Sequence, residues 1–163
     1  MTAPEAPLVT LPEALFIHTV AVRMFDTTGL GARDVGAVES ALHRPIASFA
    51  GVPRYPTATE RAAAVWWGLI KNRGFVDANK RTGTAVMHRW LNREGLRLVA
   101  APEEQIETAV AIANGEQTAE SLAEWVAGRA EPLAPAPSSP RRRPPQRQRD
   151  RARRPAHRGR ERE

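Results

Sequence analysis

The stretch from Thr57 to Ile70 constrains the fold most, because it combines a helix start signal with an uninterrupted apolar run. Thr57 and Glu60 have the Thr-x-x-Glu spacing of a capping box, in which the first turn of a helix satisfies its own free N–H groups. Residues 62–70, which include two tryptophans, contain no charged side chain. A helix that is apolar on all sides must be covered by other elements, so we expect this one to be buried on most of its surface.

Further helices are predicted on both sides of this stretch, from capping residues or Pro at their starts and Gly or Pro at their ends. They run from Thr10 to about Phe25, from Asp34 to Pro45, from about Ala78 to Glu94, from Pro102 to Asn114 and from Thr118 onward. We interpret residues 46–56 as a loop or short hairpin and residues 96–101 as a short extended connection. No segment of any length alternates with the period of a strand. The sequence therefore predicts a compact all-α bundle of five or six helices.

The composition changes after Arg129, where Pro, Arg, Gln and Ser replace the apolar residues. Such a segment cannot bury enough apolar surface to offset the entropy of ordering it. We therefore predict a helical domain at 1–130 and a disordered tail at 131–163. The tail has eleven Arg and four acidic residues, a net charge of +7, whereas residues 1–130 have a net charge of −1. Any nucleic-acid binding suggested by the overall charge of +6 is expected from the tail alone.

The sequence contains no cysteine, which excludes disulfides and thiolate metal sites. It has no apolar run of 18 residues, and its start lacks the basic-then-apolar pattern of an export signal. We expect a cytoplasmic protein without a membrane-spanning segment.

Residues 73–83, Arg-Gly-Phe-Val-Asp-Ala-Asn-Lys-Arg-Thr-Gly, are predicted to be a loop that leads into a helix. The first N–H groups of a helix have no partner within it, and the helix dipole adds about half a positive charge at that end. Asp77 can cap this helix, and Lys80 and Arg81 place two cations beside the free N–H groups. The pattern is typical of a phosphate-binding site. A capped helix with solvated Lys and Arg side chains would show the same spacing, so both interpretations stay open here.

The run from Gly74 to Thr82 resembles the signature of the Fic/Doc superfamily, H-x-F-x-D-[AG]-N-[GK]-R, in the form with Lys after Asn that marks the death-on-curing (Doc) branch. Residues 34–45, 91–95 and 115–125 are also similar to Doc-type chains and occur in the same order. The resemblance covers roughly residues 8–128, and it implies a Fic/Doc-type helical bundle.

The resemblance also implies a function. Doc-type proteins are toxins of toxin–antitoxin systems that use ATP to phosphorylate a threonine of the translation factor EF-Tu, and a Phd-type antitoxin helix blocks their groove. Other Fic proteins transfer AMP from ATP to a protein hydroxyl instead. A Lys at the position of Lys80 is associated with the phosphorylating branch.

Residue roles follow from the resemblance in the same way. Asp77 would hold Mg²⁺ or assist the leaving group, and Asn79 and Phe75 would belong to the nucleotide-binding residues. Lys80 and Arg81 would hold the phosphates of ATP. These roles agree with the anion site read from the residues themselves, since phosphoryl transfer depends mainly on positioning and on neutralising charge.

Arg73 departs from the family pattern, because the family has its catalytic His at this position. A general base must accept a proton near neutral pH, whereas a guanidinium has a pKa above about 12 and no acceptor atom. His88 lies about 10 Å along the predicted helix from Arg81, too far to replace the base. We expect His18 and His43 to pack elsewhere. Asp77 stays as an alternative base.

Three hypotheses follow from these observations. The first is a Doc-type toxin whose kinase activity is impaired by Arg73. The second is a non-catalytic relative that binds nucleotide or an antitoxin helix, with Arg73 as an additional phosphate-binding cation. The third is RNA or ribosome binding through the arginines of the tail, which contains no aromatic residue for base stacking.

Overall fold

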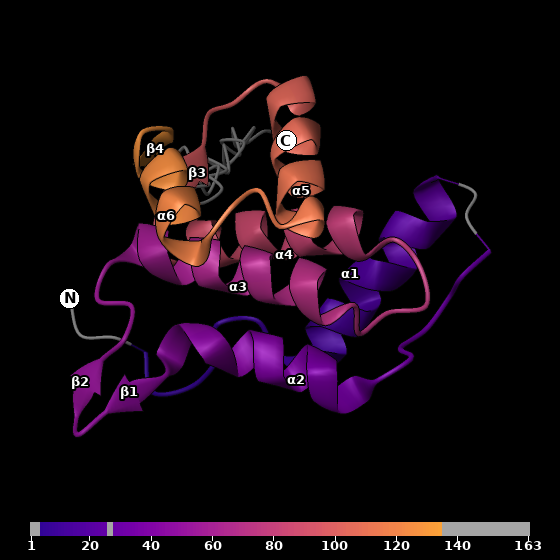
Figure 1. Ribbon diagram of the computed structural model, residues 1–163, viewed down its shortest axis with the longest axis horizontal. Helices are drawn as coiled ribbons and strands as arrows, with labels where there is room; N and C mark the ends of the chain where they lie inside the picture. Colours follow the sequence, from indigo (N-terminus) through magenta and orange to yellow (C-terminus); the bar gives the residue numbers. More distant parts are fainter. Residues whose placement is uncertain (1–3, 26–27, 135–163) are drawn as a thin grey trace, which may run out of the picture.

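The computed structural model describes residues 4–25 and 28–134, which form a helical domain built around one central helix (Figure 1). The helices are α1 (Leu11–Met24), α2 (Val35–His43), α3 (Ala58–Asn72), α4 (Asn79–Arg93), α5 (Pro102–Asn114) and α6 (Ala119–Ala127), with a 3-10 turn η1 (Arg44–Ile46) after α2. The prediction of a mostly helical bundle is confirmed.

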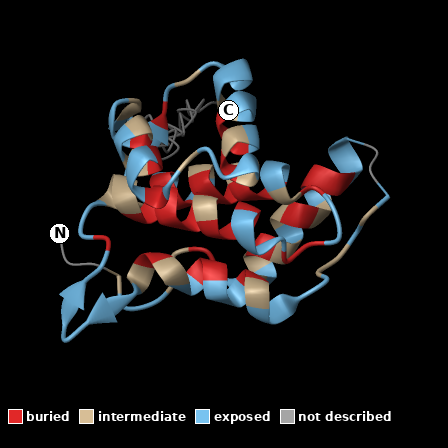
Figure 2. Cartoon of the chain, viewed as in Figure 1, coloured by how far each residue is buried: buried red, intermediate tan, exposed pale blue. Residues whose placement is uncertain are grey.

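Helix α3 is the centre of the domain, with α2, α4 and α6 packed around it. Nine of its residues are buried, and Figure 2 shows this helix mostly in the colour of buried residues. Thr57 and Glu60 form the predicted capping box, in which Glu60 N–H donates to Thr57 and Thr57 N–H donates to Glu60. The local sequence therefore sets where this helix begins, and its apolar composition sets how deeply it lies.

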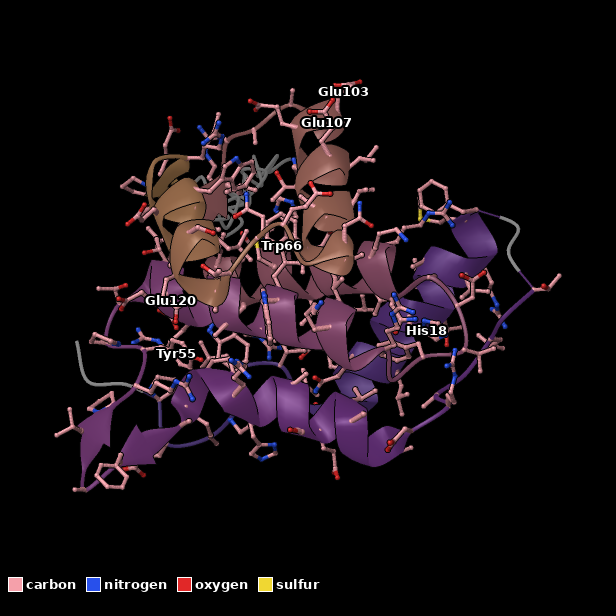
Figure 3. All side chains as sticks on the ribbon, in the orientation of Figure 1. His18, Tyr55, Trp66, Glu103, Glu107 and Glu120 are labelled. Carbon is pink, nitrogen blue, oxygen red and sulfur yellow. The ribbon has the colours of Figure 1, made fainter. Side chains whose placement is uncertain are left out.

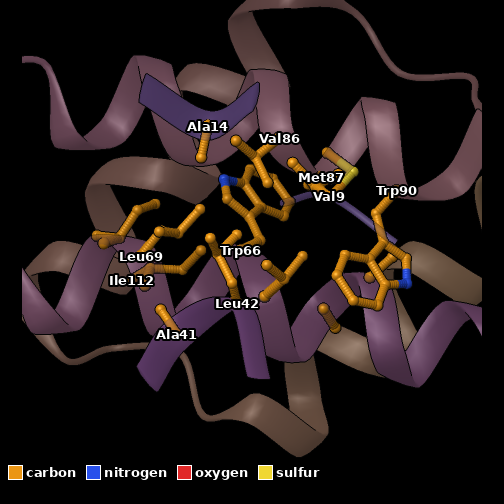
Figure 4. Close-up of a cluster of buried hydrophobic side chains, with 14 of the residues drawn as sticks. Val9, Ala14, Ala41, Leu42, Trp66, Leu69, Val86, Met87, Trp90 and Ile112 are labelled. Atoms are coloured by element: carbon orange, nitrogen blue, oxygen red, sulfur yellow. The ribbon is translucent and has the colours of Figure 1, made fainter. Parts of the chain in front are cut away.

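The core surrounds the two largest buried side chains, Trp66 of α3 and Trp90 of α4 (Figure 4). Both are fully buried, and each indole N–H has an acceptor: Trp66 donates to Thr84 over 3.0 Å and Trp90 to Glu94 over 3.0 Å. Satisfying these two donors avoids the free-energy cost of burying an unpaired polar group. Aliphatic side chains from all six helices, together with Val9 and Leu98, fill the remaining space.

Most helix ends agree with the capping signals in the sequence. Asp34 accepts from Ala37 N–H over 3.0 Å, and Thr118 accepts from Ser121 N–H over 3.1 Å. Gly95 and Gly115 follow α4 and α5 in the left-handed region, with φ of 76° and 80°, where a residue without Cβ is favoured.

Four short strands are present among the described residues, and the pairing of two of them, β3 and β4, was not predicted. The stretch 46–56 contains a hairpin of β1 (Ser48–Phe49) and β2 (Val52–Pro53). Strand β3 (Leu96–Leu98) pairs antiparallel with β4 (Ala130–Pro132). The tail boundary predicted at residue 131 is therefore wrong, because Glu131 and Pro132 belong to this ladder. Three-residue strands are too short to show a period, and their partner lies far along the chain.

The predicted disorder of residues 135–163 lies outside the described residues. Within 4–25 and 28–134, no helix combines the length and the apolarity needed to cross a bilayer.

Candidate functional site

The loop between α3 and α4 is held in an uncommon backbone conformation at both ends. Arg73, at the C-terminus of α3, has a φ of 47°, and Ala78, immediately before α4, has a φ of 55°. Left-handed backbone costs a residue with a side chain on the order of 1–3 kcal/mol, and it persists only where the surroundings enforce it. Strained backbone of this kind is often found at functional sites. Residues 73–78, which lie between these two positions, are here called the motif loop.

Asn79 shapes the motif loop from within. Its Oδ1 accepts from Phe75 N–H over 3.0 Å, and its Nδ2 donates to the Phe75 carbonyl over 3.1 Å. The side-chain amide of Asn79 thus bonds to both backbone polar groups of Phe75, four residues earlier. The nucleotide-binding role expected for Asn79 stays a prediction, but its structural role is visible.

Asp77 does not cap α4 as predicted. Its Oδ1 accepts from Ala78 N–H over 2.6 Å, and Ala78 rather than Asp77 occupies the N-cap position. The left-handed turn at Ala78 shifts the helix start by one residue, and no side chain of the described residues caps α4. The N–H groups of its first turn are therefore available to an anion.

A second segment, residues 28–34, lies along the motif loop and is here called the strap. Arg33 N–H and Asp34 N–H both donate to the Gly74 carbonyl, over 2.7 and 3.0 Å, and Val76 N–H donates to the Gly31 carbonyl over 3.0 Å. The two backbones approach so closely that a Cβ on Gly29 would lie 2.4 Å from the Asp77 Cβ. The strap therefore needs glycine at this point.

His18 of α1, labelled in Figure 3, contacts both segments. It is 1% exposed, and its ring stacks on Phe75 with centroids 4.2 Å apart and planes at 15°. Its Nε2 accepts from Gly31 N–H over 3.1 Å, and its Nδ1 forms a hydrogen bond with the Thr82 hydroxyl over 3.1 Å. Burial lowers the pKa of His18, while a backbone hydrogen bond and the charge of Asp77 act in the opposite direction.

The expectation that His18 packs away from the motif is wrong. The sequence contained one hint, because His18 shares the buried face of α1 with Ala14, Ala21 and Val22. Nothing local, however, indicates which distant element that face contacts.

Phe75 lies inside the core and does not line the cavity described below. Its side chain is fully buried in the core against His18, so it supports the motif loop from inside and is not exposed to a nucleotide. The cofactor-binding role expected for Phe75 stays a prediction, whereas its packing role beneath the motif loop is visible.

A cavity of about 470 Å³ opens over the motif loop and the start of α4. Its polar lining consists of four cationic side chains, one carboxylate and one amide, namely Arg33, Arg73, Lys80, Arg81, Asp77 and Asn79. The structure thus brings together every predicted site residue except Phe75. It adds Arg33, which comes from the strap and which the sequence did not indicate. Converging cations of this number create a positive potential suited to a ligand with several negative charges.

Arg81 is supported by an aromatic ring. Its guanidinium carbon lies 4.3 Å from the ring centroid of Phe25, at the end of α1. A cation over a ring face is attracted by the ring quadrupole, and the planar guanidinium keeps its N–H donors free at the edge.

Histidine does not contribute to the cavity lining in the described part of the chain. His88 contacts Gln105 of α5 over 2.6 Å and is partly buried, as expected for a residue on a groove wall. His43 bonds to the Glu39 carbonyl on α2. Asp77 is the remaining group in the cavity that could accept a proton.

Asp77 also fits the Mg²⁺ expected from the family. Within 4–25 and 28–134, no group of three or more His, Asp or Glu side chains gathers around one point. Mg²⁺, however, is often held by one or two carboxylates together with substrate phosphates and water. One carboxylate oxygen of Asp77 accepts from Ala78 N–H, and its other oxygen suits such a site.

Comparison with known proteins agrees with this geometry. The sequence profile of the Fic/DOC family matches residues 8–91, just over half of the chain, and this range includes α1, the strap, the motif loop and most of α4. The chain belongs to the Fic/DOC family. The resemblance noted in the motif is thereby confirmed, although the profile ends before residues 92–128.

The Fic/DOC chain is also similar to a protein named Toxin Doc from Mycolicibacterium smegmatis. The two are 39% identical over 71 residues, which is 44% of this chain and 55% of that relative. The match thus spans about half the length of the relative.

Proposed function

We propose that this Fic/DOC-family protein binds the polyphosphate of ATP in the cavity over the motif loop. The observation that carries the proposal is the lining of that cavity, where four cations face one carboxylate at an uncapped helix start. Each charge-assisted hydrogen bond to a phosphate is stronger than a neutral one. A triphosphate would therefore offset the mutual repulsion of these side chains.

The reaction we propose is transfer of a phosphoryl group from ATP to a protein hydroxyl, with a threonine of EF-Tu as the family-derived target, at a strongly reduced rate. Arg73 occupies the position of the family base and cannot accept a proton. Losing a positioned base costs about 10² to 10⁴ in rate. The cation at this position strengthens phosphate binding while it weakens the chemistry.

Mg²⁺ would be held by Asp77 and the bound phosphates. When present, it would neutralise charge that develops on the phosphates during transfer. The protein's own part is to orient the phosphates through Lys80, Arg81 and the first-turn N–H groups of α4.

The test uses Arg73→His, because histidine is among the residues that tolerate a left-handed backbone. With labelled ATP, Mg²⁺ and EF-Tu, we expect little transfer by the present chain and substantial transfer by Arg73→His. Arg73→Gln is the matched control, since it removes the same charge without supplying a base. Efficient transfer by the unchanged protein would contradict the need for a base at this position.

A second proposed function, binding of a Phd-type antitoxin helix, is favoured by an apolar stripe on α1. Phe16, Val20 and Met24 follow one another at a spacing of four and are 68%, 39% and 74% exposed. An amphipathic helix docks on such a face through anchors at the same spacing. Met24→Asp should weaken capture of a co-expressed antitoxin, whereas Phe49→Asp on the β1–β2 hairpin should not. Equal effects of the two substitutions would remove the support for α1.

A further inference from the structure

Arg33 is placed in the cavity by the strap and not by the family motif. Two backbone bonds to the Gly74 carbonyl fix its position, through its own N–H and that of Asp34. Its Nη2 donates to the Val76 carbonyl over 3.3 Å, which leaves most of the five guanidinium donors available. Within the described residues it forms no ion pair, although Asp77 lines the same cavity.

The contact with Val76 does not by itself account for Arg33. It is long, exposed and directed to a neutral acceptor, so its net stabilisation is small. An exposed cation that projects over a cavity with three other cations raises the local repulsion. That arrangement becomes favourable when an anion occupies the cavity.

His18 holds the strap in place through a hydrogen bond from the strap backbone. The neutral ring accepts the Gly31 N–H and stacks on Phe75, so one side chain contacts both the strap and the motif loop. Removing the acceptor at Nε2 would leave the Gly31 N–H without its partner and would loosen the segment that carries Arg33.

We propose that Arg33 is a phosphate-binding residue of this site and that His18 is the positioning residue that holds it there. This inference rests on the proposed binding of ATP phosphates. It adds the strap as a second segment of the chain that contacts them. The phosphates are then bound from two sides, by Lys80 and Arg81 of α4 and by Arg33 of the strap.

The first experiment measures the affinity for Mg²⁺–ATP and for inorganic triphosphate by calorimetric titration. Arg33→Gln keeps a donor for the Val76 carbonyl but removes the charge, and we expect about a tenfold loss for both ligands. Arg33→Lys should recover part of the loss. Arg54→Gln is the matched control, since it removes the same charge near the opposite end of α3, and it should bind as the unchanged protein does.

The outcomes separate the two proposals. If the unchanged protein does not bind either ligand, or if Lys80→Ala has no effect, the proposed function is wrong and this inference falls with it. If Lys80→Ala weakens binding while Arg33→Gln leaves it unchanged, the role of Arg33 is wrong and the proposed function stands.

The second experiment tests His18 through a double-mutant cycle. His18→Phe retains a flat ring against Phe75 but removes the acceptor for Gly31 N–H. Because His18 is argued to act through Arg33, His18→Phe combined with Arg33→Gln should lose no more affinity than Arg33→Gln alone. Losses that multiply would show an independent structural effect and overturn the positioning role. Should His18→Phe fail to fold by circular dichroism, His18→Gln, which retains an acceptor, takes its place, with the expectation of a smaller loss and the same lack of additivity.

Discussion

The two ends of α3 use arginine in opposite ways. Near its N-terminus, Arg61 is 2% exposed and all three of its guanidinium nitrogens donate hydrogen bonds. Nε and Nη2 donate to the two oxygens of Glu94, over 2.8 and 2.7 Å, and Nη1 donates to the carbonyls of Tyr55 and Pro56. Beyond its C-terminus, four cations line a cavity with a single carboxylate.

The comparison shows that the bonding partners of a charged side chain distinguish a structural role from a ligand-binding one. A buried guanidinium is tolerated where a bidentate carboxylate and backbone carbonyls replace its hydration. A group of cations without equal negative charge remains hydrated and ready to bind an anion. Residue type alone does not separate the two cases, whereas the partners do.

The largest expected effect comes from removing the partner of the buried arginine. Glu94→Ala leaves the Arg61 charge buried and unpaired, so the free energy of unfolding should fall by about 3–5 kcal/mol. Chemical denaturation followed by circular dichroism measures it. Glu124→Ala, on the exposed face of α6, is the control and should change stability by no more than about 0.5 kcal/mol. A similar small change for Glu94→Ala would contradict the structural role of this ion pair.

The second prediction concerns the other end of α3. Lys80→Ala combined with Arg81→Ala should lower the affinity for Mg²⁺–ATP by about a hundredfold or more, because each cation is expected to contribute a charge-assisted bond. Stability without ligand should change little, since neither side chain forms an ion pair with the residues that the structure describes. Thermal unfolding with and without ATP reports both quantities. A large loss of stability without ligand would place these cations in the same class as Arg61.

The smallest expected effect is the pH dependence due to His18. Burial lowers the pKa of His18 in the folded protein below its usual value of 6.5, so the unfolded chain takes up the proton first as the pH falls. This residue should therefore leave the free energy of unfolding unaffected above about pH 6.5, and should lower it as the pH decreases through the interval between 6.5 and the folded pKa. His18→Gln should flatten the pH profile there, whereas His43→Gln should not. An unchanged profile in His18→Gln would show that His18 is not the group responsible.

Local patterns predicted much of the fold. The capping box at Thr57, the caps at Asp34 and Thr118 and the apolar run of α3 are all present where expected, because each depends on hydrogen bonds or periodicity within a few residues. Asp77 was assigned the wrong capping role, since the left-handed backbone of Ala78 arises from the contacts of the loop and not from its residue types.

The sequence by itself determined the helices and the grouping of Asp77 to Arg81, since these residues are neighbours in the chain and must lie together. Only the tertiary structure decided which other residues join them. His18 bonds to Thr82 across 64 positions, and the strap delivers Arg33 through backbone bonds to Gly74. Contacts of this kind depend on how whole helices pack, and packing is set by the combined shape of many side chains. No local pattern around His18 or Arg33 carries that information.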